Sequence, residues 1–319
     1  MIIKTLNRSE AQNAMKEWVL NYPSLPEVEG DYLKIRKDID SLASTYSTGL
    51  AISDGVKAAI VGSPNTGKSS FLNMLSGFER AIVTDIAGTT RDAIDTEITH
   101  NGKEYVLIDT AGLRRKNKIK EELERYMIIR TVAAVERADI VVLVIDAVEG
   151  VTEQDAKIAG IAHDRGKAVI IAVNKWDAIE KGNKTVNEYT AKVRQVLSFM
   201  SYAEILFVSA ATGQRLPKLF DMIDAVYQNH SMRVATGVLN EIMAEAVAMQ
   251  QPPTDKGKRL RLYYITQVAV KPPTFVIFVN DKELMHFSYT RYLENQIRDT
   301  FGFSGTPLKF IIRERKENK

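Results

Sequence analysis

Residues Gly62 to Ser69 have the types and the spacing of a phosphate-binding loop. The segment reads Gly62-Ser-Pro-Asn-Thr-Gly-Lys68-Ser69, follows a β-branched run and precedes a helical pattern. In that setting backbone N–H groups and the helix N-terminus bind phosphate oxygens. Lys68 would bring a positive charge to the β and γ phosphates, and the Ser69 hydroxyl would ligate Mg²⁺. Taken alone, the motif also fits a ligand-free glycine-rich turn. The expected nucleotide contacts are Gly62, Ser63, Pro64, Asn65, Thr66, Gly67, Lys68 and Ser69.

Two later segments predict loops that respond to a γ phosphate. In Gly88-Thr-Thr-Arg-Asp92, Thr90 is best placed to complete the Mg²⁺ shell. Asp109-Thr-Ala-Gly112 follows an apolar strand, so its carboxylate can meet Mg²⁺ through water and the Gly112 N–H can meet the γ phosphate. Such loops are ordered by phosphate and released after hydrolysis. We therefore expect catalytic roles for Lys68, Thr90 and Gly112, and nucleotide contacts from Asp109, Thr110, Ala111, Gly112 and Leu113.

The segment Asn174-Lys-Trp-Asp177, at the end of a predicted strand, indicates which base is bound. An Asp carboxylate accepts both the N1–H and the N2–H₂ of guanine, whereas adenine offers an acceptor at N1 and no amino group at C2. Since unpaired polar groups reject the wrong base, the motif favours guanine. Ser209-Ala-Ala211 follows the last strand and would place an N–H near guanine O6. The expected contacts are Asn174, Lys175, Trp176, Asp177, Ser209 and Ala210.

The elements that must position these loops alternate between short strands and amphipathic helices, as in a parallel sheet with crossover helices. We predict strands at Val56–Val61, Glu104–Ile108, Ile140–Ile145, Ala168–Val173 and Glu204–Val208. Helical patterns cover Lys68–Gly77, Glu122–Arg137, Glu153–Asp164, Val186–Met200 and Leu216–Asn229. The sequence therefore predicts a doubly wound α/β domain over residues 55–230.

After His230 the pattern changes to a helix, two strands, a helix and a strand, which predicts a smaller α+β domain over residues 231–319. The predicted elements are Val238–Met249, Leu260–Val270, Phe275–Val279, Tyr289–Thr300 and Leu308–Ile312, with Ser231–Gly237 as a linker and Gln250–Gly257 as a loop. Residues 1–54 form a separate extension, in which Tyr22–Gly30 has the composition of a loop and Asp31–Ala43 has helical spacing.

Composition indicates a protein of reducing, intracellular surroundings, because the 319 residues include no Cys and the N-terminus lacks a signal-peptide pattern. The longest apolar runs are too short to cross a membrane, which takes roughly 20 residues. Charge is uneven: residues 1–231 carry 29 Lys and Arg against 31 Asp and Glu, whereas residues 232–319 carry 14 against 9. The basic C-terminal part is either a nucleic-acid surface or a solvated face.

These motifs resemble the G domains of Era-like GTPases, and residues 92–319 resemble the second G domain and the KH-like domain of the Der (EngA) ribosome-assembly GTPases. The specific strings are Asp109-Thr-Ala-Gly-Leu-Arg-Arg-Lys116, Val173-Asn-Lys-Trp-Asp-Ala178, Val270-Lys-Pro-Pro-Thr-Phe-Val276, Asn280-Asp-Lys-Glu-Leu-Met-His-Phe-Ser288 and Gly302-Phe-Ser-Gly-Thr-Pro307. The resemblance implies a P-loop GTPase domain followed by a KH-like domain. It also implies a cytoplasmic, GTP-hydrolysing switch that acts on the pre-ribosomal 50S particle or rRNA.

Residues 1–92 instead resemble the tRNA-modification GTPase MnmE, including Ala81-Ile-Val-Thr-Asp-Ile-Ala-Gly-Thr-Thr-Arg-Asp92. The chain is similar to a mosaic of the two families, natural or engineered, with a join near residues 92–97. MnmE ends in a Cys motif, which is missing here. This resemblance supports an alternative function in tRNA modification, and MnmE-like G domains also pair through their switch regions.

The resemblance also bears on catalysis. Leu113 stands where Ras-like enzymes have a Gln that orients water. MnmE-like domains hold K⁺ beside the phosphates, and the matching positions are Asn65, Thr84, Ile86 and Thr89; Asn65 otherwise only shapes the loop. MnmE also orients water with a Glu, matched by Glu124, although a Glu there also suits a helix N-terminus. Without hydrolysis, the chain would be a nucleotide-sensing adaptor.

A KH fold binds RNA through a Gly-x-x-Gly loop between two helices. Gly302-Phe-Ser-Gly305 has these letters but lies between a predicted helix and a predicted strand, so we expect a turn without an RNA contact. RNA contacts would come from Lys256, Lys258, Arg259, Arg261, Arg313, Arg315 and Lys316. The aromatic residues Tyr263, Tyr264, Phe275 and Phe278 alternate as strand residues do, and we expect them in the core. Arg114, Arg115, Lys116 and Lys118 fit either an rRNA contact or a solvated loop.

Overall fold

The computed structural model of the chain describes residues 55–77, 81–82, 95–108, 122–180, 182–255 and 257–315, apart from the side chains at 81–82, 122–127 and 255. By its internal contacts the chain divides into two compact units, Met1–Ser47 and Thr48–Lys319. The predictions for residues 1–54 lie outside the described residues. Everything below concerns the second unit.

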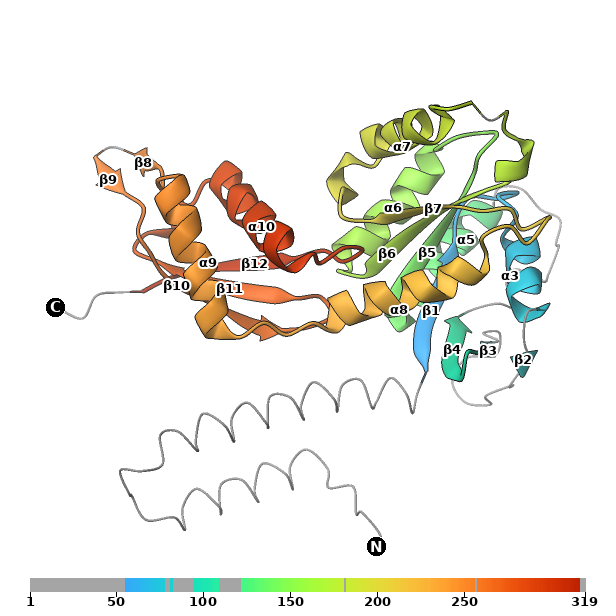
Figure 1. Cartoon of the computed structure of the whole chain (residues 1–319), viewed down its shortest axis with the longest axis horizontal. Coiled ribbons are helices and arrows are strands. Elements are labelled where there is room, and N and C mark those ends of the chain that lie inside the picture. Colours follow the sequence, from blue (N-terminus) through green and yellow to red (C-terminus); the bar gives the residue numbers. More distant parts are fainter. Residues whose placement is uncertain are drawn as a thin grey trace, which may run out of the picture. The chain divides into compact units, whose positions relative to one another are not determined.

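A seven-stranded sheet forms the centre of the larger region, in the order β2-β3-β4-β1-β5-β6-β7 (Figure 1). Its strands are β1 (Val56–Val61), β2 (Ala81–Ile82), β3 (Thr96–His100), β4 (Lys103–Ile108), β5 (Ile140–Asp146), β6 (Ala168–Asn174) and β7 (Glu204–Phe207). From β4 to β7 neighbouring strands are parallel, whereas β3 is antiparallel to both β2 and β4. The predicted α/β fold with a largely parallel sheet is therefore confirmed.

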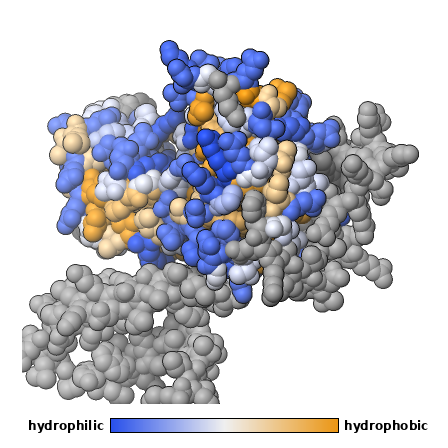
Figure 2. Space-filling view, turned by 45° about the vertical axis from the view of Figure 1, so that its right-hand side comes forward, coloured by the Kyte–Doolittle hydropathy of each residue, from blue (hydrophilic) through white to orange (hydrophobic). Residues whose placement is uncertain are grey.

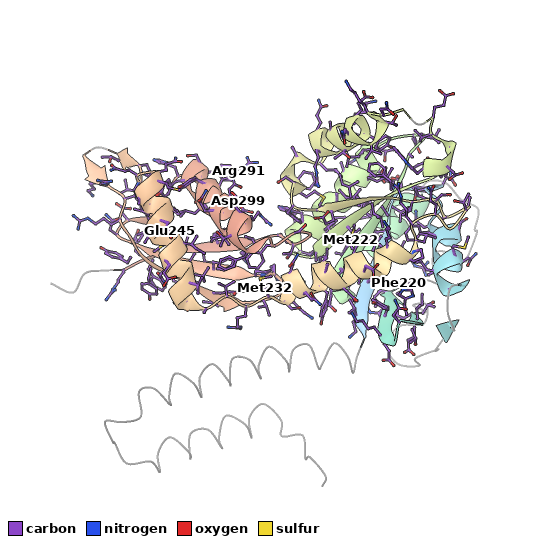
Figure 3. All side chains as sticks on the ribbon, in the orientation of Figure 1. Phe220, Met222, Met232, Glu245, Arg291 and Asp299 are labelled. Carbon is purple, nitrogen blue, oxygen red and sulfur yellow. The ribbon has the colours of Figure 1, made fainter. Side chains whose placement is uncertain are left out.

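Helices cover both faces of this sheet, which is why β5 and β6 are buried along their whole length and are almost entirely apolar. One core contains residues of α3 (Lys68–Gly77) and α8 (Pro217–Ser231). The opposite core contains residues of α5 (Glu122–Arg137), α6 (Glu153–Asp164) and α7 (Thr185–Val196). On α8, Phe220 (labelled in Figure 3) is buried. Its ring centroid lies 4.9 Å from that of Tyr105 in β4.

The sequence-based assignments differ from the structure at element ends and in the short strands. The predicted helix Val186–Met200 ends at Val196 and is followed by a separate 3₁₀ turn, Ser198–Met200. The antiparallel strands β2 and β3 were not predicted; β3 lies beside β4, and β2 lies beside β3 at the edge of the sheet. The predicted linker Ser231–Gly237 is shorter, because α8 includes Ser231 and α9 (Thr236–Met249) begins at Thr236. Met232 lies at this junction (Figure 3).

The C-terminal region contains a three-stranded sheet, β10-β11-β12, with a core shared by α9 and α10 (Phe287–Phe301). The strands β10 (Leu262–Ala269) and β11 (Thr274–Val279) are antiparallel, and β12 (Lys309–Glu314) is parallel to β11. The predicted order of helix, two strands, helix and strand is confirmed. The predicted loop Gln250–Gly257 is wrong in part, because β8 (Thr254–Asp255) pairs with β9 (Lys258–Arg259) as a small hairpin.

Asn240 of α9 occupies the outer edge of β10. Its amide donates to the Ile265 carbonyl at 2.9 Å and accepts from the Ile265 N–H at 3.0 Å. The side chain therefore satisfies backbone groups that an edge strand would otherwise leave open to another strand.

None of the helices in the described ranges is both long enough and apolar enough to span a membrane.

The turn Gly302–Gly305, between α10 and β12, packs against the larger region. The Gly305 N–H donates to the Tyr202 carbonyl at 2.8 Å, and the Gly305 carbonyl accepts from the Val169 N–H at 2.7 Å. The Ser304 hydroxyl donates to Glu204, and the Ser304 carbonyl accepts from Asn229 at 2.9 Å. The segment is thus a turn, as expected, and its backbone is engaged within the protein.

Candidate nucleotide-binding site

The phosphate-binding loop connects β1 to α3 at the carboxyl end of the parallel strands. Its backbone takes positive φ at Gly62 (149°), Asn65 (65°) and Gly67 (85°). A Cβ at Gly62 would lie 2.2 Å from the Val144 carbonyl oxygen, and a Cβ at Gly67 would lie 2.5 Å from Asn174 Nδ2. Both glycines are therefore required by the close approach of neighbouring atoms as well as by φ.

Lys68 begins α3 and reaches back across the loop. Its Nζ donates to the Gly62 carbonyl at 2.8 Å and to the Ser63 carbonyl. Burial lowers the pKa of Lys68 to about 8, and the negative charge of Asp155 opposes that shift. At neutral pH the side chain therefore keeps most of its positive charge, which suits a contact with phosphate.

Asn174, at the end of β6, joins three of the predicted motifs. It is 1% exposed. Its Nδ2 donates to the Thr66 carbonyl at 2.9 Å, and its Oδ1 accepts from the Ala210 N–H at 2.9 Å. The same side chain thus ties the base-selecting segment to the phosphate-binding loop and to Ser209–Ala211. This contact explains why Asn, with one donor and one acceptor end, suits the position.

The next three residues point in different directions. Lys175 has a left-handed backbone (φ 60°), and its Nζ lies 2.5 Å from Asp146 Oδ2 at the end of β5. Trp176 is buried and packs on Phe207, with ring centroids 4.3 Å apart. Asp177 is exposed. The Trp176 side chain therefore anchors the segment in the core, while Asp177 stays exposed, which suits the predicted contact with a base.

Asp146 shows how the Lys175 ammonium is held. Burial raises the pKa of Asp146, but the hydrogen bond and charge of Lys175, together with the N–H groups of Val148 and Glu149, outweigh burial, so the pKa lies below its ordinary value. The carboxylate therefore stays ionised at neutral pH and holds the Lys175 ammonium. Ser209 and Ala210, after β7, are buried, and the Ser209 hydroxyl accepts from the Thr212 N–H at 3.2 Å.

Several predicted site residues lie outside the described residues: Thr84, Ile86, Thr89, Thr90, Asp109, Thr110, Ala111, Gly112 and Leu113. The backbone of Glu124 lies in the first turn of α5, but its side chain is also outside. Their roles remain predictions. The structure brings together the phosphate-binding loop, Asn174–Asp177 and Ser209–Ala210.

The described residues fit Mg²⁺ and a nucleotide at the phosphate-binding loop. Ser69 is exposed in the first turn of α3, where a hydroxyl can ligate a hard cation beside phosphate. Asn65 is exposed in the middle of the loop and offers an amide oxygen. The close approach of the Val144 carbonyl to Gly62 and of Asn174 to Gly67 leaves no room for a Cβ at either glycine.

Sequence reasoning missed Asp155, a fully buried residue of α6 whose carboxylate contacts Ser63 of the phosphate-binding loop. The pair Thr152 and Asp155 forms a capping box at the start of α6. The local spacing of a Thr and an acidic residue three positions later could have indicated that box. The contact to Ser63, 92 residues away, has no local signal.

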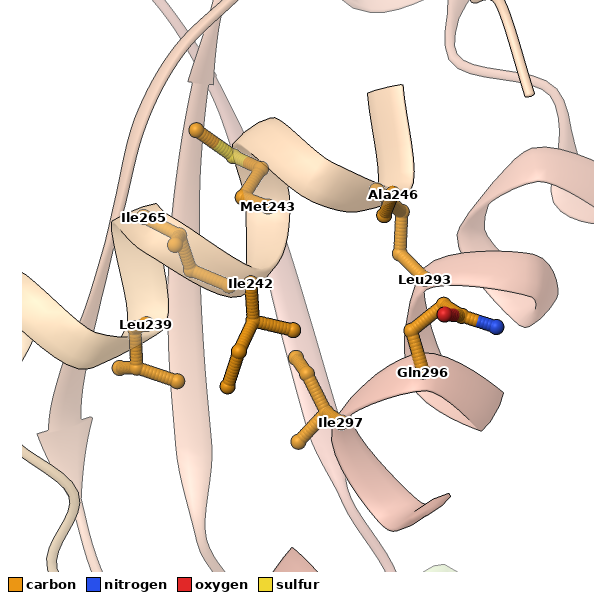
Figure 4. Close-up of a pocket in the computed structure, with 8 residues that line it drawn as sticks. All are labelled: Leu239, Ile242, Met243, Ala246, Ile265, Leu293, Gln296 and Ile297. Atoms are coloured by element: carbon orange, nitrogen blue, oxygen red, sulfur yellow. The ribbon is translucent and has the colours of Figure 1, made fainter. Parts of the chain in front are cut away.

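The C-terminal region carries a crevice that does not suit phosphate. It is lined by Leu239, Ile242, Met243, Ala246, Ile265, Leu293, Gln296 and Ile297, from α9, β10 and α10 (Figure 4). Seven of these side chains are apolar. Exposed apolar residues of this region include Val238, Met249, Val268 and Phe287, and apolar colouring is visible over it in Figure 2.

Of the four aromatic residues expected in the core, only Phe275 is fully buried. Tyr264 and Phe278 are half-buried and stack on each other, 4.3 Å apart, across β10 and β11. The expectation is wrong for this pair, because alternation along a strand places them on the opposite face of the sheet from Ile265 and Ile277, which belong to the core. The predicted basic residues Lys258, Arg259, Arg261, Arg313 and Arg315 are exposed, whereas Lys256 and Lys316 lie outside the described residues.

Two protein-family models match the chain. Residues 57–175 match a family described as a 50S ribosome-binding GTPase. Residues 233–313 match the KH-domain-like C-terminal region of EngA bacterial GTPase enzymes. The two matches together take in the phosphate-binding loop, Asn174 and the C-terminal sheet up to residue 313.

Curated relatives are similar over most of the chain. GTPase Der of Agathobacter rectalis is 75% identical over 266 residues, which is 83% of this chain and 60% of that protein. GTPase Der of Lachnoclostridium phytofermentans is 75% identical over 262 residues, covering 82% and 59%. The chain thus spans about 60% of the length of these relatives. A solved structure of Aquifex aeolicus Era bound to GDP and AlF4⁻ matches 82% of this chain and 94% of its own at 22% identity, with a TM-score of 0.43.

Proposed function

This chain belongs to the Der (EngA) family of GTPases, and we therefore propose that it hydrolyses GTP to GDP and phosphate as a switch in assembly of the large ribosomal subunit. The observation that carries the proposal is the double contact of Asn174 with Thr66 and Ala210. One buried amide holds the phosphate-binding loop and the base-selecting segments in a single arrangement. That arrangement suits a guanine nucleotide.

The chemistry falls to residues in three groups. Lys68 supplies positive charge to the β and γ phosphates, while Asp177 accepts from the N1–H and N2–H₂ of guanine. Mg²⁺ would be held by Ser69, Thr90 and, through water, Asp109. When bound, it neutralises charge on the phosphates. Thr90 and Gly112 sense the γ phosphate, so hydrolysis releases their loops.

Leu113 cannot orient water, so another group must assist hydrolysis. We assign this role to a site for K⁺ formed by Asn65, the carbonyls of Thr84 and Ile86, and Thr89, with Glu124 as a candidate for orienting water. The exposed position of Asn65 in the loop supports this assignment. A bound K⁺ supplies a fixed positive charge beside the phosphates.

The target is a 50S particle or its rRNA, in a cytoplasmic setting. The exposed residues Lys258, Arg259 and Arg261 lie on and beside the β8–β9 hairpin, and Arg313 and Arg315 lie at the end of β12. Because phosphate contacts dominate affinity for RNA, such a surface supports binding that weakens as salt rises. The engaged backbone of Gly302–Gly305 favours these side chains over that turn.

Phosphate release tests the proposed activity. We expect multiple-turnover release from GTP and none from ATP. Release from GTP should be faster in KCl than in NaCl at equal ionic strength. Equal rates in the two salts would remove K⁺ from the assignment, and tight GTP binding without turnover would make the chain an adaptor.

Co-sedimentation with large ribosomal subunits tests the partner. We expect more binding with a GTP analogue than with GDP, and binding that ignores the nucleotide argues against a switch. The tRNA-modification alternative rests on the N-terminal resemblance alone, and none of the relatives described above is a tRNA-modification protein. Sedimentation of the free protein with each nucleotide tests whether two copies pair through their switch loops.

A further inference from the structure

A buried carboxylate lies directly behind the phosphate-binding loop. Asp155, in the first turn of α6, is 0% exposed. It accepts from the Ser63 N–H at 3.1 Å and the Ser63 hydroxyl at 2.6 Å. It also accepts from the Thr152 N–H at 3.0 Å and the Thr152 hydroxyl at 2.8 Å. Four donors thus compensate the burial of one negative charge.

The two oxygens of Asp155 serve different partners. Oδ2 accepts both hydrogen bonds from Thr152 and so completes the capping box of α6. In that box the Asp155 N–H donates to the Thr152 hydroxyl at 3.2 Å. Oδ1 accepts both hydrogen bonds from Ser63. Capping therefore accounts for Oδ2 alone, because a capping box is complete without a distant residue. The bonds at Oδ1 act on the phosphate-binding loop.

The Ser63 peptide is held from its other side as well. The Ser63 carbonyl accepts from the Thr66 hydroxyl at 3.0 Å and from Lys68. The residue before it, Gly62, has φ 149° and packs closely on the Val144 carbonyl. Asp155 and Lys68 thus hold the Ser63 peptide, at the start of the loop, through its N–H and its carbonyl.

We propose that Asp155 is a positioning residue that holds the phosphate-binding loop ready for the phosphates of a guanine nucleotide. The inference rests on the proposed function. A loop already in its bound conformation loses less conformational freedom when the ligand arrives, so preorganisation raises affinity. Asp155 acts on this loop through Ser63 and does not touch the nucleotide.

The test compares Asp155→Asn, Ser63→Ala and the double variant in the full chain, with Asp164→Asn as the matched control. Asp164 is exposed and ends the same helix, whereas Asp155 lies in its first turn, so the control makes the same chemical change away from the loop. Fluorescent GDP and a fluorescent GTP analogue report affinity and release rate. Thermal unfolding without nucleotide reports the fold.

We expect Asp155→Asn to weaken both nucleotides about tenfold, mainly through faster release, because hydrogen bonds to a charged group are lost. Ser63→Ala keeps the backbone N–H and should cost about threefold. The double variant should bind about as weakly as Asp155→Asn, since both changes remove one interaction. The KM for GTP should rise by a similar factor, with kcat at saturating GTP nearly unchanged.

Three results would overturn the proposal: affinity of Asp155→Asn equal to that of Asp164→Asn, single effects that multiply in the double variant, or lowered unfolding temperature with unchanged affinity. If Asp155→Asn does not fold, Ser63→Ala decides, because it leaves the capping box intact. A wild-type chain that binds no guanine nucleotide would contradict the proposed function itself and is recognised before any variant is made.

Discussion

The phosphate-binding loop and the turn Gly302–Gly305 both place glycines at positive φ, but they lie at opposite ends of their helices. Gly67 precedes α3, where the N–H groups of a first turn have no helical partner. Gly302 follows α10, and its own N–H donates back to the Arg298 carbonyl at 2.7 Å. The segment before α3 therefore has N–H donors available for an anion. The turn after α10 has its N–H donor bonded within the protein and serves packing instead.

Their surroundings extend this difference. Behind the loop, Asn174 donates to the Thr66 carbonyl, and Asp155 accepts from the Ser63 N–H. Around Gly305, both backbone groups are bonded, and a Cβ would lie 2.3 Å from a Val226 methyl. Two glycine-containing segments thus differ in role: Gly62–Ser69 suits a ligand, whereas Gly302–Gly305 packs one region against the other. Substitutions in and beside the two turns test whether they differ in this way.

The largest effect should follow from Gly67→Ala. The new Cβ meets Asn174 Nδ2 at 2.5 Å, and φ is 85°, so both the side-chain brace and the loop must shift. We expect guanine-nucleotide affinity to fall at least about a hundredfold, from strain and lost hydrogen bonds of roughly 3–4 kcal/mol. Fluorescent GDP titration measures it. Near-normal affinity would show that the loop tolerates the shift.

Gly305→Ala should destabilise the protein and spare the nucleotide site. The added methyl overlaps Val226, and φ is 76°. Overpacking and a left-handed alanine together should cost about 3 kcal/mol of unfolding free energy. Urea unfolding measures this cost. GDP affinity at low temperature, within about twofold of wild type, is the matched readout, and a large loss of affinity would mean that the turn controls the nucleotide site.

Arg298→Met tests how the same turn is braced. Arg298 Nη1 donates to the Phe303 carbonyl at 2.9 Å and to the Thr306 carbonyl at 3.1 Å. Loss of these bonds should lower the unfolding free energy by about 2 kcal/mol. The same urea experiment checks it, with exposed Arg291, on the same helix, changed to Met as the control. Equal unfolding free energies of the two variants would show that these Arg298 hydrogen bonds do not stabilise the turn.

The smallest effect concerns pH. His230 is 1% exposed, and its Nδ1 lies 2.7 Å from the Thr306 hydroxyl. Burial, with added repulsion from Lys271 and Lys167, lowers the pKa of His230 to about 3 from 6.5. The unfolded chain therefore takes up a proton first, so stability is full above about pH 6.5 and declines as pH falls toward 3.

Between pH 6.5 and 5.5 this histidine should account for roughly 1 kcal/mol of lost unfolding free energy. Urea unfolding at both pH values, in wild type and in His230→Gln, isolates the contribution. The variant should lose about 1 kcal/mol less than wild type over the interval. An identical decline in both proteins would show that other groups set the acid sensitivity.

Most of the larger elements could be predicted because their signals are local. The helices Lys68–Gly77, Glu122–Arg137 and Glu153–Asp164 and the strand Val56–Val61 end where the sequence pattern ends. The short strands β2, β8 and β9, of two residues each, carry too few side chains to show a period. For Tyr264 and Phe278, the alternation along the strands separates two faces of the sheet, but it does not say which face the helices cover.

The chemistry of the site could be predicted from the sequence. Gly62–Ser69 predict a phosphate-binding loop and Asn174–Asp177 predict a guanine contact, because each function depends on residues close together in the chain. What holds these segments in place is visible in the tertiary structure alone. The Asp155–Ser63 contact spans 92 residues, and the Asn174–Thr66 contact spans 108. Such partners meet because parallel strands bring their carboxyl ends to one edge, and no local pattern records which side chains will face each other there.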